Sequence, residues 1–410
     1  MIDIKLVRTQ PDMVRDLCQR RRCEVDVDRL VEVDKQLRET ITKLDTARQA
    51  RKALKGPEAR EKGPALKAEI AEMERVSKEL EEERDRLWAM LPNLLAPDTP
   101  DGKSDAENVQ LTTWGEKPQF TFPVKPHEVI GADLGILDLP RGAKVAGSGY
   151  YYWKGDGAKL VWALFRLAEE FLVKRGFTPM LTPVVARERT LFGTGYLPFF
   201  RDQIYKIENE DLCLIGTSEQ TMVGLHADEI LDPATLPYLY NAFTPCFRTE
   251  RGAYGQASRG AFRVHQFHKV EQIVFCRPEE SEKWHEECLK NEVEFMQLLE
   301  VPYRVVRVCM GDLGAPGYKK YDVEAWFAGF NGYRETHSNT NLLDYQTRRL
   351  NIRCKDAGGT FHPHTISATM ITDRAALAIL ENNQQQDGSV VVPKALRPYM
   401  YGVEKIAKKA

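Results

Sequence analysis

The stretch FRTERGAYGQASRGAFRVHQF, residues 247–267, places four arginines, one glutamate and three glycines between two phenylalanines. Strand-like sequence flanks its centre, NAFTPCFRTE before and AFRVHQFHKVEQIVF after, with RGAYGQASRG as a turn between them. Guanidinium groups at this density repel one another unless an anion lies among them. The stretch therefore predicts a strand, a loop and a returning strand that together bind a ligand carrying phosphate.

The first strand of this hairpin ends with a cation and an acceptor on one face. Arg248 and Glu250 are two positions apart, so both side chains point the same way. A guanidinium suits a phosphate, a carboxylate suits an exocyclic amine, and the ring of Phe267 suits a stacked base. A surface hairpin with balanced charges is the alternative, but it leaves Arg259 and Arg263 unpaired.

The sequence around the hairpin contains both helical and strand-like segments. Helical patterns cover residues 157–175, 278–299 and 374–383, and the first has its apolar residues on one face. Strand-like runs are CLIGT, YNAFTPCF, AFRVHQF, VEQIVFC and YRVVRVCM. Neighbouring strands are often hairpin-spaced, which favours an antiparallel sheet flanked by helices over a regular βαβ series. The predicted fold class is therefore α+β.

The N-terminal region has the pattern of two paired helices. Leu30, Leu37 and Leu44 repeat every seven residues, and a second heptad series follows a turn. The members of that second series are Leu66, Ile70, Met73, Leu80, Leu87 and Leu91. The sequence LKGPEAREKGPAL between the two series contains two Gly-Pro pairs, which break any helix. These features predict an antiparallel coiled-coil hairpin.

Charge is uneven along the predicted hairpin. Residues 48–62, around the turn, have six basic and two acidic side chains, whereas residues 69–86 have eight acidic and four basic. A solvated coiled-coil surface explains the acidic arm, while the basic turn also suits a polyanion. The segment 91–105 is rich in Pro, Asp and Gly and reads as a linker. We therefore expect two domains, 1–105 and 106–410.

The composition and net charge of the chain restrict the class of protein to which it can belong. Lys plus Arg is 58 and Asp plus Glu is 60, so the net charge of −2 confines any nucleic-acid binding to local patches. No run approaches the roughly 20 apolar residues that span a bilayer, and the mixed polar N-terminus is not a signal peptide. Eight cysteines occur without a CxxC pair, which predicts neither a zinc site nor a disulfide framework. A cytoplasmic protein is expected.

Several of these segments together resemble one family. FRTERG with RVHQF resembles motif 2 of class II aminoacyl-tRNA synthetases, in the form found in seryl-tRNA synthetases. GFTPMLTPVV resembles the dimer-forming motif 1, with Pro183 at its signature proline, and LIGTSEQ resembles the TxE loop. GDLGAPGYKKYDVEAW, YRETHSNTN and ALAILENNQQQDGSVVVPKALRPYM complete the match, the last around motif 3. The resemblance runs nearly the whole length, and the helical hairpin looks like the family's tRNA-binding arm.

The resemblance implies a serine–tRNA ligase whose class II catalytic domain, built on an antiparallel sheet, follows the coiled-coil hairpin. Such an enzyme activates L-serine with ATP to seryl-adenylate and transfers the seryl group to tRNA(Ser). We expect tRNA(Sec) as a second substrate, Mg²⁺ as cofactor and a homodimer. Because the adenylate is already activated, the transfer needs no Ser-His-Asp set. His265 and His337 are accordingly expected to be structural.

Two other functions stay open on the sequence. A specialised paralogue could charge a carrier protein or accept a serine analogue, but relatives of the first kind look truncated at the arm that this chain retains. A non-catalytic RNA-binding dimer would have lost side chains needed for catalysis. The positions that test this are Arg248, Glu271, Glu335 and Arg374, and all four are filled as the chemistry requires.

The resemblance assigns a nucleotide site by position. Arg248 matches the arginine that bridges the amino-acid carboxylate and the α-phosphate, and Arg374 matches the motif 3 arginine; these are the expected catalytic residues. Glu250 matches the reader of the adenine amine and Phe267 the ring stacked on adenine. Glu335 and Ser338 match the pair that ligates Mg²⁺. The expected ATP-binding set is Arg248, Thr249, Glu250, Val264, Phe267, Glu335, Thr336, His337, Ser338 and Arg374.

The serine pocket needs a partner for an ammonium and one for a hydroxyl. Thr217 and Glu219 match the loop that receives the α-amino group, Glu271 matches the glutamate at the serine hydroxyl, and Thr369 matches the position that shares it. A site built around that hydroxyl should reject alanine by roughly 10⁴-fold, because its polar groups would be left unpaired. The expected serine-binding set is Thr217, Ser218, Glu219, Arg248, Glu271, Asn341 and Thr369.

The chain departs from the family pattern in three places. Ile-Ser-Ala at 366–368 stands where family members usually carry Leu-Asn-Gly, and the loss of a glycine there predicts an altered backbone beside Thr369. Arg251 replaces a typically small residue in the motif 2 loop, and His268 replaces a usual Asp or Asn. An added arginine at 251 could strengthen contact with tRNA phosphate or simply be solvated.

Overall fold

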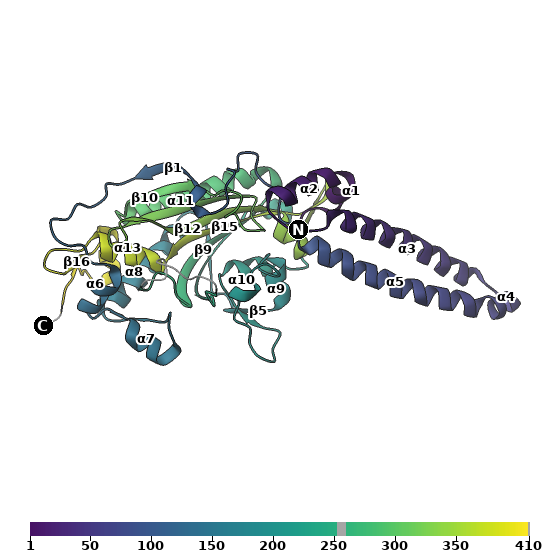
Figure 1. The fold of residues 1–410 in the computed structure, drawn as a ribbon, viewed down its shortest axis with the longest axis horizontal. Coiled ribbons are helices and arrows are strands. Elements are labelled where there is room, and N and C mark those ends of the chain that lie inside the picture. Colours follow the sequence, from purple (N-terminus) through teal and green to yellow (C-terminus); the bar gives the residue numbers. More distant parts are fainter. Residues whose placement is uncertain (252–259, 409–410) are drawn as a thin grey trace. The chain divides into compact units, whose positions relative to one another are not determined.

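The computed structural model describes residues 1–251 and 260–408. They form two compact units, Met1–Leu94 and Leu95–Ala410, and the division falls inside the segment that the sequence predicts as a linker. The first unit is helical and the second is built on a sheet with helices (Figure 1). The predicted α+β fold class is therefore confirmed.

The first unit is dominated by a long helical hairpin (Figure 1). Its two arms pack on each other through buried Leu44, Ala47 and Ile70, as the heptad pattern predicts. Asp26 begins the first arm by accepting a hydrogen bond from the N–H of Arg29 at 2.8 Å. The helices of this unit are α1 Ile4–Thr9, α2 Pro11–Arg20, α3 Val27–Ala53, α4 Gly56–Glu61 and α5 Gly63–Ala89.

The turn of the hairpin differs from its prediction. The two Gly-Pro pairs were expected only to break helices, but each begins one: Pro57 lies in the first turn of α4 and Pro64 in the first turn of α5. Proline is tolerated there because the first N–H groups of a helix have no intrahelical partner. The turn is thus a short helix flanked by two breaks.

The second unit contains an eight-stranded sheet with the strand order β1-β10-β11-β12-β15-β9-β8-β4. All neighbours in it pair antiparallel except β4 and β8, which are parallel. The hairpin predicted from the opening stretch is β8 and β9. In sheet order the bounds are Val109–Trp114, Tyr303–Arg307, Lys319–Phe327, Gly332–Leu343, His364–Thr372, Gln266–Cys276, Tyr238–Phe247 and Thr178–Met180.

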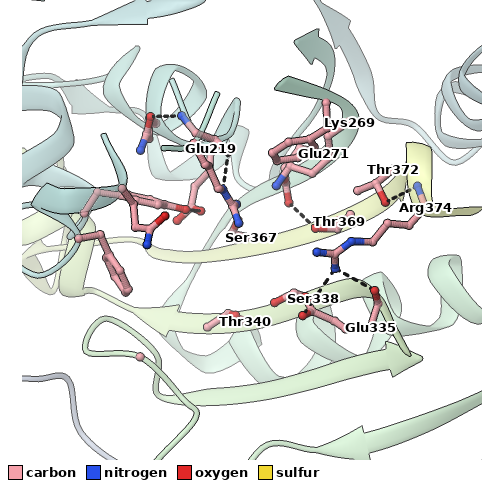
Figure 2. Close-up of a pocket in the computed structure, with 18 of the residues that line it drawn as sticks. Glu219, Lys269, Glu271, Glu335, Ser338, Thr340, Ser367, Thr369, Thr372 and Arg374 are labelled. Atoms are coloured by element: carbon pink, nitrogen blue, oxygen red, sulfur yellow. Dashed lines mark hydrogen bonds and ion pairs between the residues drawn. The ribbon is translucent and has the colours of Figure 1, made fainter. Parts of the chain in front are cut away.

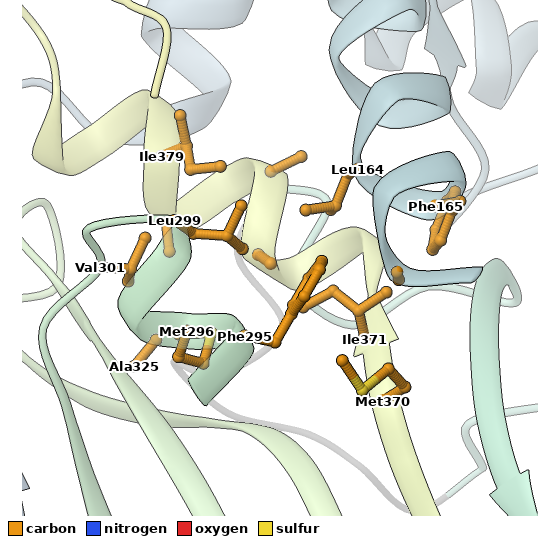
Figure 3. Close-up of a cluster of buried hydrophobic side chains, with 14 of the residues drawn as sticks. Leu164, Phe165, Phe295, Met296, Leu299, Val301, Ala325, Met370, Ile371 and Ile379 are labelled. Carbon is orange, nitrogen blue, oxygen red and sulfur yellow. The ribbon is translucent and has the colours of Figure 1, made fainter. Parts of the chain in front are cut away.

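Three helices cover one face of the sheet and close the main core. They are α8 Asp156–Val173, α11 Ser281–Leu298 and α13 Asp373–Asn382, each within a few residues of its predicted range. Figure 3 shows Leu164 of α8, Phe295 of α11 and Ile379 of α13 in one apolar cluster with Met370 and Ile371 of β15. The pairing of β15 with β9 shifts between Thr369 and Ile371, which lets the two adjacent residues Met370 and Ile371 both join the core.

Shorter elements connect this framework. The remaining helices are α6 His127–Asp133, α7 Leu139–Ala146, α9 Glu188–Gly193, α10 Glu219–Gly224 and α12 Tyr345–Arg349. The remaining strands are β2 Leu137–Asp138, β3 Tyr152–Trp153, β5 Val185–Ala186, β6 Cys213–Leu214, β7 Ile230–Leu231, β13 Arg353–Asp356, β14 Gly359–Phe361, β16 Val390–Val391 and β17 Lys405–Ile406.

Two expectations from composition can be compared with the structure. Within the described residues, no helix combines the length and the apolar character that crossing a bilayer requires. All eight cysteines lie in the described residues, and all are free thiols there.

Candidate active site

A cavity of about 570 Å³ opens on the face of the sheet opposite the covering helices. Its floor is formed by β9, β12 and β15, and its walls by the chain after β8 and the start of α13 (Figure 2). The volume is that of an ordinary small-molecule site. Alternation along the strands explains the lining: on β9, Lys269 and Glu271 face the cavity, whereas Val270 and Gln272 face the helices.

Two arginines line this cavity. Arg248 directly follows β8, and its Nε–H donates to the carbonyl of Gly216 at 3.3 Å while its guanidinium lies 5.2 Å from the ring centre of Phe267. Arg374 is the second residue of α13, where the Thr372 hydroxyl accepts its N–H at 3.3 Å. Burial lowers the pKa of Arg374, and the charge of Glu335 opposes that shift. The two cations are thus held by backbone acceptors and aromatic rings, a setting that receives an anion without rearrangement.

Glu335 and Ser338 lie on the same face of β12 because of a bulge. Residues three apart on a regular strand point to opposite faces, but the pairing with β11 shifts between Val323 and Glu324 and inserts Thr336 as an extra residue. Both side chains consequently line the cavity (Figure 2). They offer a carboxylate and a hydroxyl oxygen, the ligand type that Mg²⁺ prefers, so the donor set fits this ion.

The charge of Glu335 is set by the cations around it. Burial by itself would raise the pKa of this carboxyl, but Arg374, then Lys320, Arg248 and Arg263, outweigh burial and lower it. Arg374 Nη1 lies 2.9 Å from the Glu335 carbonyl and 3.8 Å from its Oε2. About half of the Glu335 side chain, 48%, is nevertheless open to solvent through the cavity. An ionised oxygen is therefore available to an incoming ligand.

Glu271 is the centre of a second, more buried group. The Thr217 hydroxyl donates to its Oε2 at 2.9 Å, and the Thr369 hydroxyl donates to its Oε1 at 3.4 Å. Thr369 and Glu271 are directly opposed in the pairing of β15 with β9. Lys269, two residues along the same strand, forms an ion pair with Oε2. These partners compensate a carboxylate that burial would otherwise destabilise.

Glu219, the first residue of α10, supplies another buried carboxylate. The Tyr196 hydroxyl donates to its Oε2 at 2.9 Å and the Gln346 amide to its Oε1 at 2.6 Å. Burial raises the pKa of Glu219, and the nearby charge of Glu271 raises it further. Two carboxylates in one recess favour a ligand with an ammonium group.

Glu250 has a partner of its own in the described chain. Its carboxylate accepts from Arg263 Nη1 at 2.9 Å, and its backbone has a φ of 51°, an uncommon conformation for a residue other than glycine. Arg263 is therefore not the unpaired cation that the sequence suggested. Arg259, the other arginine of that prediction, lies outside the described residues.

The sequence-predicted site residues divide into two groups. Those that line the cavity are Arg248, Glu250, Val264, Phe267, Glu219, Glu271, Glu335, Thr336, Ser338, Thr369 and Arg374. The others are not part of the lining: Thr217, Ser218, His337 and Asn341 are buried, and Thr249 is partly exposed. Thr217 reaches the site through its bond to Glu271, whereas the Thr249 hydroxyl donates to the carbonyl of Asp202.

The two histidines expected to be structural are held in the framework. His337 is buried, burial lowers its pKa to about 3, and its Nδ1 contacts the Thr336 hydroxyl at 2.8 Å. His265 accepts a backbone hydrogen bond from Arg248 through its carbonyl at 3.0 Å, and its Nδ1 lies 3.0 Å from the carbonyl of Arg248. The second histidine therefore anchors the backbone of an arginine rather than facing the cavity.

The three departures from the family pattern can be located. Ile-Ser-Ala at 366–368 lies in regular pairing with both neighbouring strands, and the register shift on β15 comes after Thr369. Ser367 lines the cavity. The N–H of His268 donates to Asp373 Oδ2 at 2.8 Å, and its ring stacks on Phe243. Arg251 is exposed.

Sequence reasoning missed two lysines that line the cavity. Lys269 pairs with Glu271, and Lys320 lies 3.0 Å from Asp322 in a buried pair, where burial raises the pKa of the aspartate. In both pairs the lysine stands two residues before the carboxylate on one strand. A charged i, i+2 pair inside a strand-like run was the available signal, because it places both side chains on one face.

The comparisons with known proteins agree with this geometry. Residues 204–383 match the family described as tRNA synthetase class II core domain (G, H, P, S and T), and residues 1–95 match the seryl-tRNA synthetase N-terminal domain. The serine–tRNA ligase of Rubrobacter xylanophilus is 42% identical over 98% of both chains, and that of Methanocella arvoryzae is 44% identical over 98% of this chain and all of its own.

Solved structures agree over the full length. The seryl-tRNA synthetase from Pyrococcus horikoshii, complexed with ATP, superposes with a TM-score of 0.94 at 38% identity and full coverage of both chains. The cytoplasmic serine–tRNA ligase from Naegleria fowleri, in complex with AMP, gives a TM-score of 0.90 at 33% identity and covers all of this chain and 99% of its own.

Proposed function

The chain belongs to the seryl-tRNA synthetase family of class II aminoacyl-tRNA synthetases, and from this premise we propose which residues carry each step of its reaction. Its activity is that of a serine–tRNA ligase that uses ATP. The observation that carries the residue assignments is the convergence of Arg248, Arg374 and Glu271 on one cavity.

Serine is recognised at the inner end of the cavity. The α-ammonium group pairs with Glu219, and the hydroxyl donates to Glu271, with Thr369 beside it. Arg248 binds the carboxylate of serine and orients it toward the nucleotide. Alanine leaves the carboxylate of Glu271 without a donor, which is why it should be rejected.

ATP occupies the outer part of the cavity. Phe267 stacks on the adenine, and Glu250 accepts from its exocyclic amine once it releases Arg263, its present partner. Arg374 lies along the phosphates on the far side. Burial beside an aromatic ring makes this guanidinium a stronger partner for phosphate than it would be in water.

In the first step the serine carboxylate attacks the α-phosphate and pyrophosphate leaves. Arg248 holds both reacting groups and stabilises the charge that develops on the phosphorus oxygens. Glu335 and Ser338 would hold Mg²⁺, which when bound neutralises phosphate charge. In the second step a terminal hydroxyl of tRNA attacks the acyl carbon, its proton passes to a phosphate oxygen of the departing AMP or to water, and AMP leaves. Proximity rather than a new protein nucleophile therefore accelerates the transfer.

The helical hairpin is assigned to tRNA. Its turn carries exposed cations that neutralise phosphate, namely Arg51, Lys52, Lys55, Arg60 and Lys62. We assign residues 1–105 to this arm and its linker and residues 106–410 to catalysis. tRNA(Ser) is the substrate that the family activity names, and tRNA(Sec) and a cytoplasmic location are extensions of the same proposal.

A homodimer is supported by an apolar surface beside β4, the edge strand of the sheet. Leu181 is 94% exposed and Trp162 on the adjacent α8 is 69% exposed, with Phe243 of β8 also open to solvent. Large apolar side chains gathered at an edge strand are typical of an interface. The pattern LTPVV that begins at Leu181 belongs to the predicted dimer-forming motif.

The test is serine-dependent exchange between ATP and pyrophosphate, run with each amino acid in turn. We expect serine to support exchange and alanine to be lower in kcat/KM by roughly 10⁴-fold. Exchange with a serine analogue but not with serine would favour the specialised paralogue. If none of the amino acids supports exchange, the non-catalytic dimer would be favoured. Charging of tRNA(Ser) and tRNA(Sec) transcripts then tests the second step.

A further inference from the structure

Lys269 lies in the cavity but has no part in the assignments above. It is on β9, two residues before Glu271, and only 6% of its surface is exposed. Lysine is almost never buried to this extent unless a carboxylate compensates its charge. Figure 2 shows both side chains on the same strand, directed to the same end of the cavity.

The two oxygens of Glu271 are not equally occupied. Oε2 receives the Thr217 hydroxyl at 2.9 Å and also the ammonium of Lys269. Oε1 receives the Thr369 hydroxyl at 3.4 Å, near the limit of a hydrogen bond. A carboxylate oxygen accepts more than one donor, so Oε1 has capacity for a further short bond.

The surrounding charges explain why a cation is needed here. Glu219 and Glu271 place two carboxylates in one recess, and the ammonium of Lys269 counteracts the rise in the pKa of Glu219 that burial and Glu271 cause. Arg248 faces the same recess from the end of β8. The other titratable groups facing the pair are Tyr196, Cys246 on β8 and, behind the sheet, Glu292 of α11.

We propose that Lys269 is a positioning residue for serine: its ammonium holds Oε2 of Glu271, so that Oε1 is turned toward the substrate hydroxyl. The Lys269 side chain itself does not contact the substrate. The inference rests on the proposed role of Glu271 as the hydroxyl acceptor and adds the group that fixes its rotamer.

The experiment compares Lys269→Met, Lys269→Arg and the parent enzyme in serine-dependent exchange. We expect Lys269→Met to raise KM for serine about 100-fold, because it leaves a buried charge without its partner, with KM for ATP changed less than about threefold. The kcat for exchange should change less than KM for serine, because Lys269 does not touch the reacting groups. Lys269→Arg should restore most of the affinity for serine.

A matched control is Lys405→Met, which removes a lysine paired with Asp387 at 2.8 Å on the surface. Lys405→Met should change neither KM for serine nor KM for ATP. If Lys269→Met raises the KM values for serine and ATP equally, or if Lys269→Arg restores none of the lost affinity for serine, the residue is merely structural and the proposal is wrong.

The double variant Lys269→Met with Glu271→Gln keeps the test usable if the single variant does not fold, because it removes both charges of the pair. In the Glu271→Gln background, Lys269→Met should add less than about threefold to KM for serine, since its effect acts through the carboxylate. An additive effect would contradict the proposal. Absence of serine-dependent exchange in the parent enzyme would instead refute the proposed function.

Discussion

The helical hairpin and the cavity use the same charged residues in opposite surroundings. On α5, Arg75 lies 2.6 Å from both Glu72 and Glu79, and more than half of each of these side chains is exposed. In the cavity, Lys269 and Glu271 are paired almost out of reach of water. Solvent screens the first group and leaves it replaceable, whereas the second pair cannot lose a partner without stranding a charge. The position of a charge in the fold, more than its type, decides what it contributes.

Removing the hairpin should distinguish the functions of the two regions most clearly, because only tRNA charging depends on the hairpin. We expect replacement of residues 38–77 by a short glycine linker to reduce tRNA charging at least about 100-fold, because the phosphate contacts of the arm are lost. Serine-dependent exchange should stay within about twofold, since the cavity is lined only by residues of the second unit. The cut leaves the apolar cluster around Leu30 and Leu91 intact. Unchanged charging would reject the role of the arm.

Within the cavity, Arg248→Ala should have the largest effect. We expect exchange to fall about 10³-fold in kcat, because the guanidinium stabilises charge that develops only in the transition state. The thermal unfolding midpoint should change little, as the side chain lines a cavity. Arg189→Ala, which removes an exposed arginine paired with Asp228, is the control and should retain parent activity. Exchange close to that of the parent enzyme would contradict the assignment of Arg248.

The difference between buried and exposed charged groups can also be tested through the pH dependence of stability, at a buried histidine. Burial lowers the pKa of His285 to about 3, and its Nε2 lies 3.1 Å from the Asn339 carbonyl. The folded state therefore favours the neutral ring, so its contribution to stability is complete above the ordinary pKa of 6.5 and is lost as pH falls toward 3. The slope for one such group is up to about 1.4 kcal/mol per pH unit.

His285→Asn should flatten this acid loss of stability. Urea unfolding at pH 4, 5, 6 and 7 measures the slope in the parent and in the variant. Ile70→Val, a destabilising change in the core of the hairpin, serves as the control, because it should lower stability without altering the slope. An unchanged slope in His285→Asn would show that this histidine does not titrate on unfolding.

The smallest effect is expected on the surface of the hairpin. Arg75→Ala removes two ion pairs seen in the structure, yet the midpoint of thermal unfolding should stay within experimental error, because each pair is exposed and screened. A clear loss of stability would mean that the exposed charges of α5 act as a network, and the contrast with the cavity would then need revision.

Much of the fold could be predicted because it follows from local patterns. The heptads of α3 and the apolar face of α8 are periodic and buried, and the heptad positions of α5 are buried at Ile70 and half-buried at most of the others. The bulge at Thr336 could not be predicted from spacing: Glu335 and Ser338 are three residues apart, which on a regular strand would separate them. Only the pairing with β11 shows that one residue is extra.

The sequence by itself determined the helices, the hairpin strands and the residue types that chemistry on a phosphate demands, because periodicity and composition act over short distances along the chain. The tertiary structure decided which charges meet. Glu271 receives Thr217 from the loop before α10 and Thr369 from β15, which are about 50 and 100 residues away along the chain. Such neighbours are set by strand order and register, and no local pattern encodes them. Lys269, two residues away on the same strand, is the one partner that a local pattern could indicate.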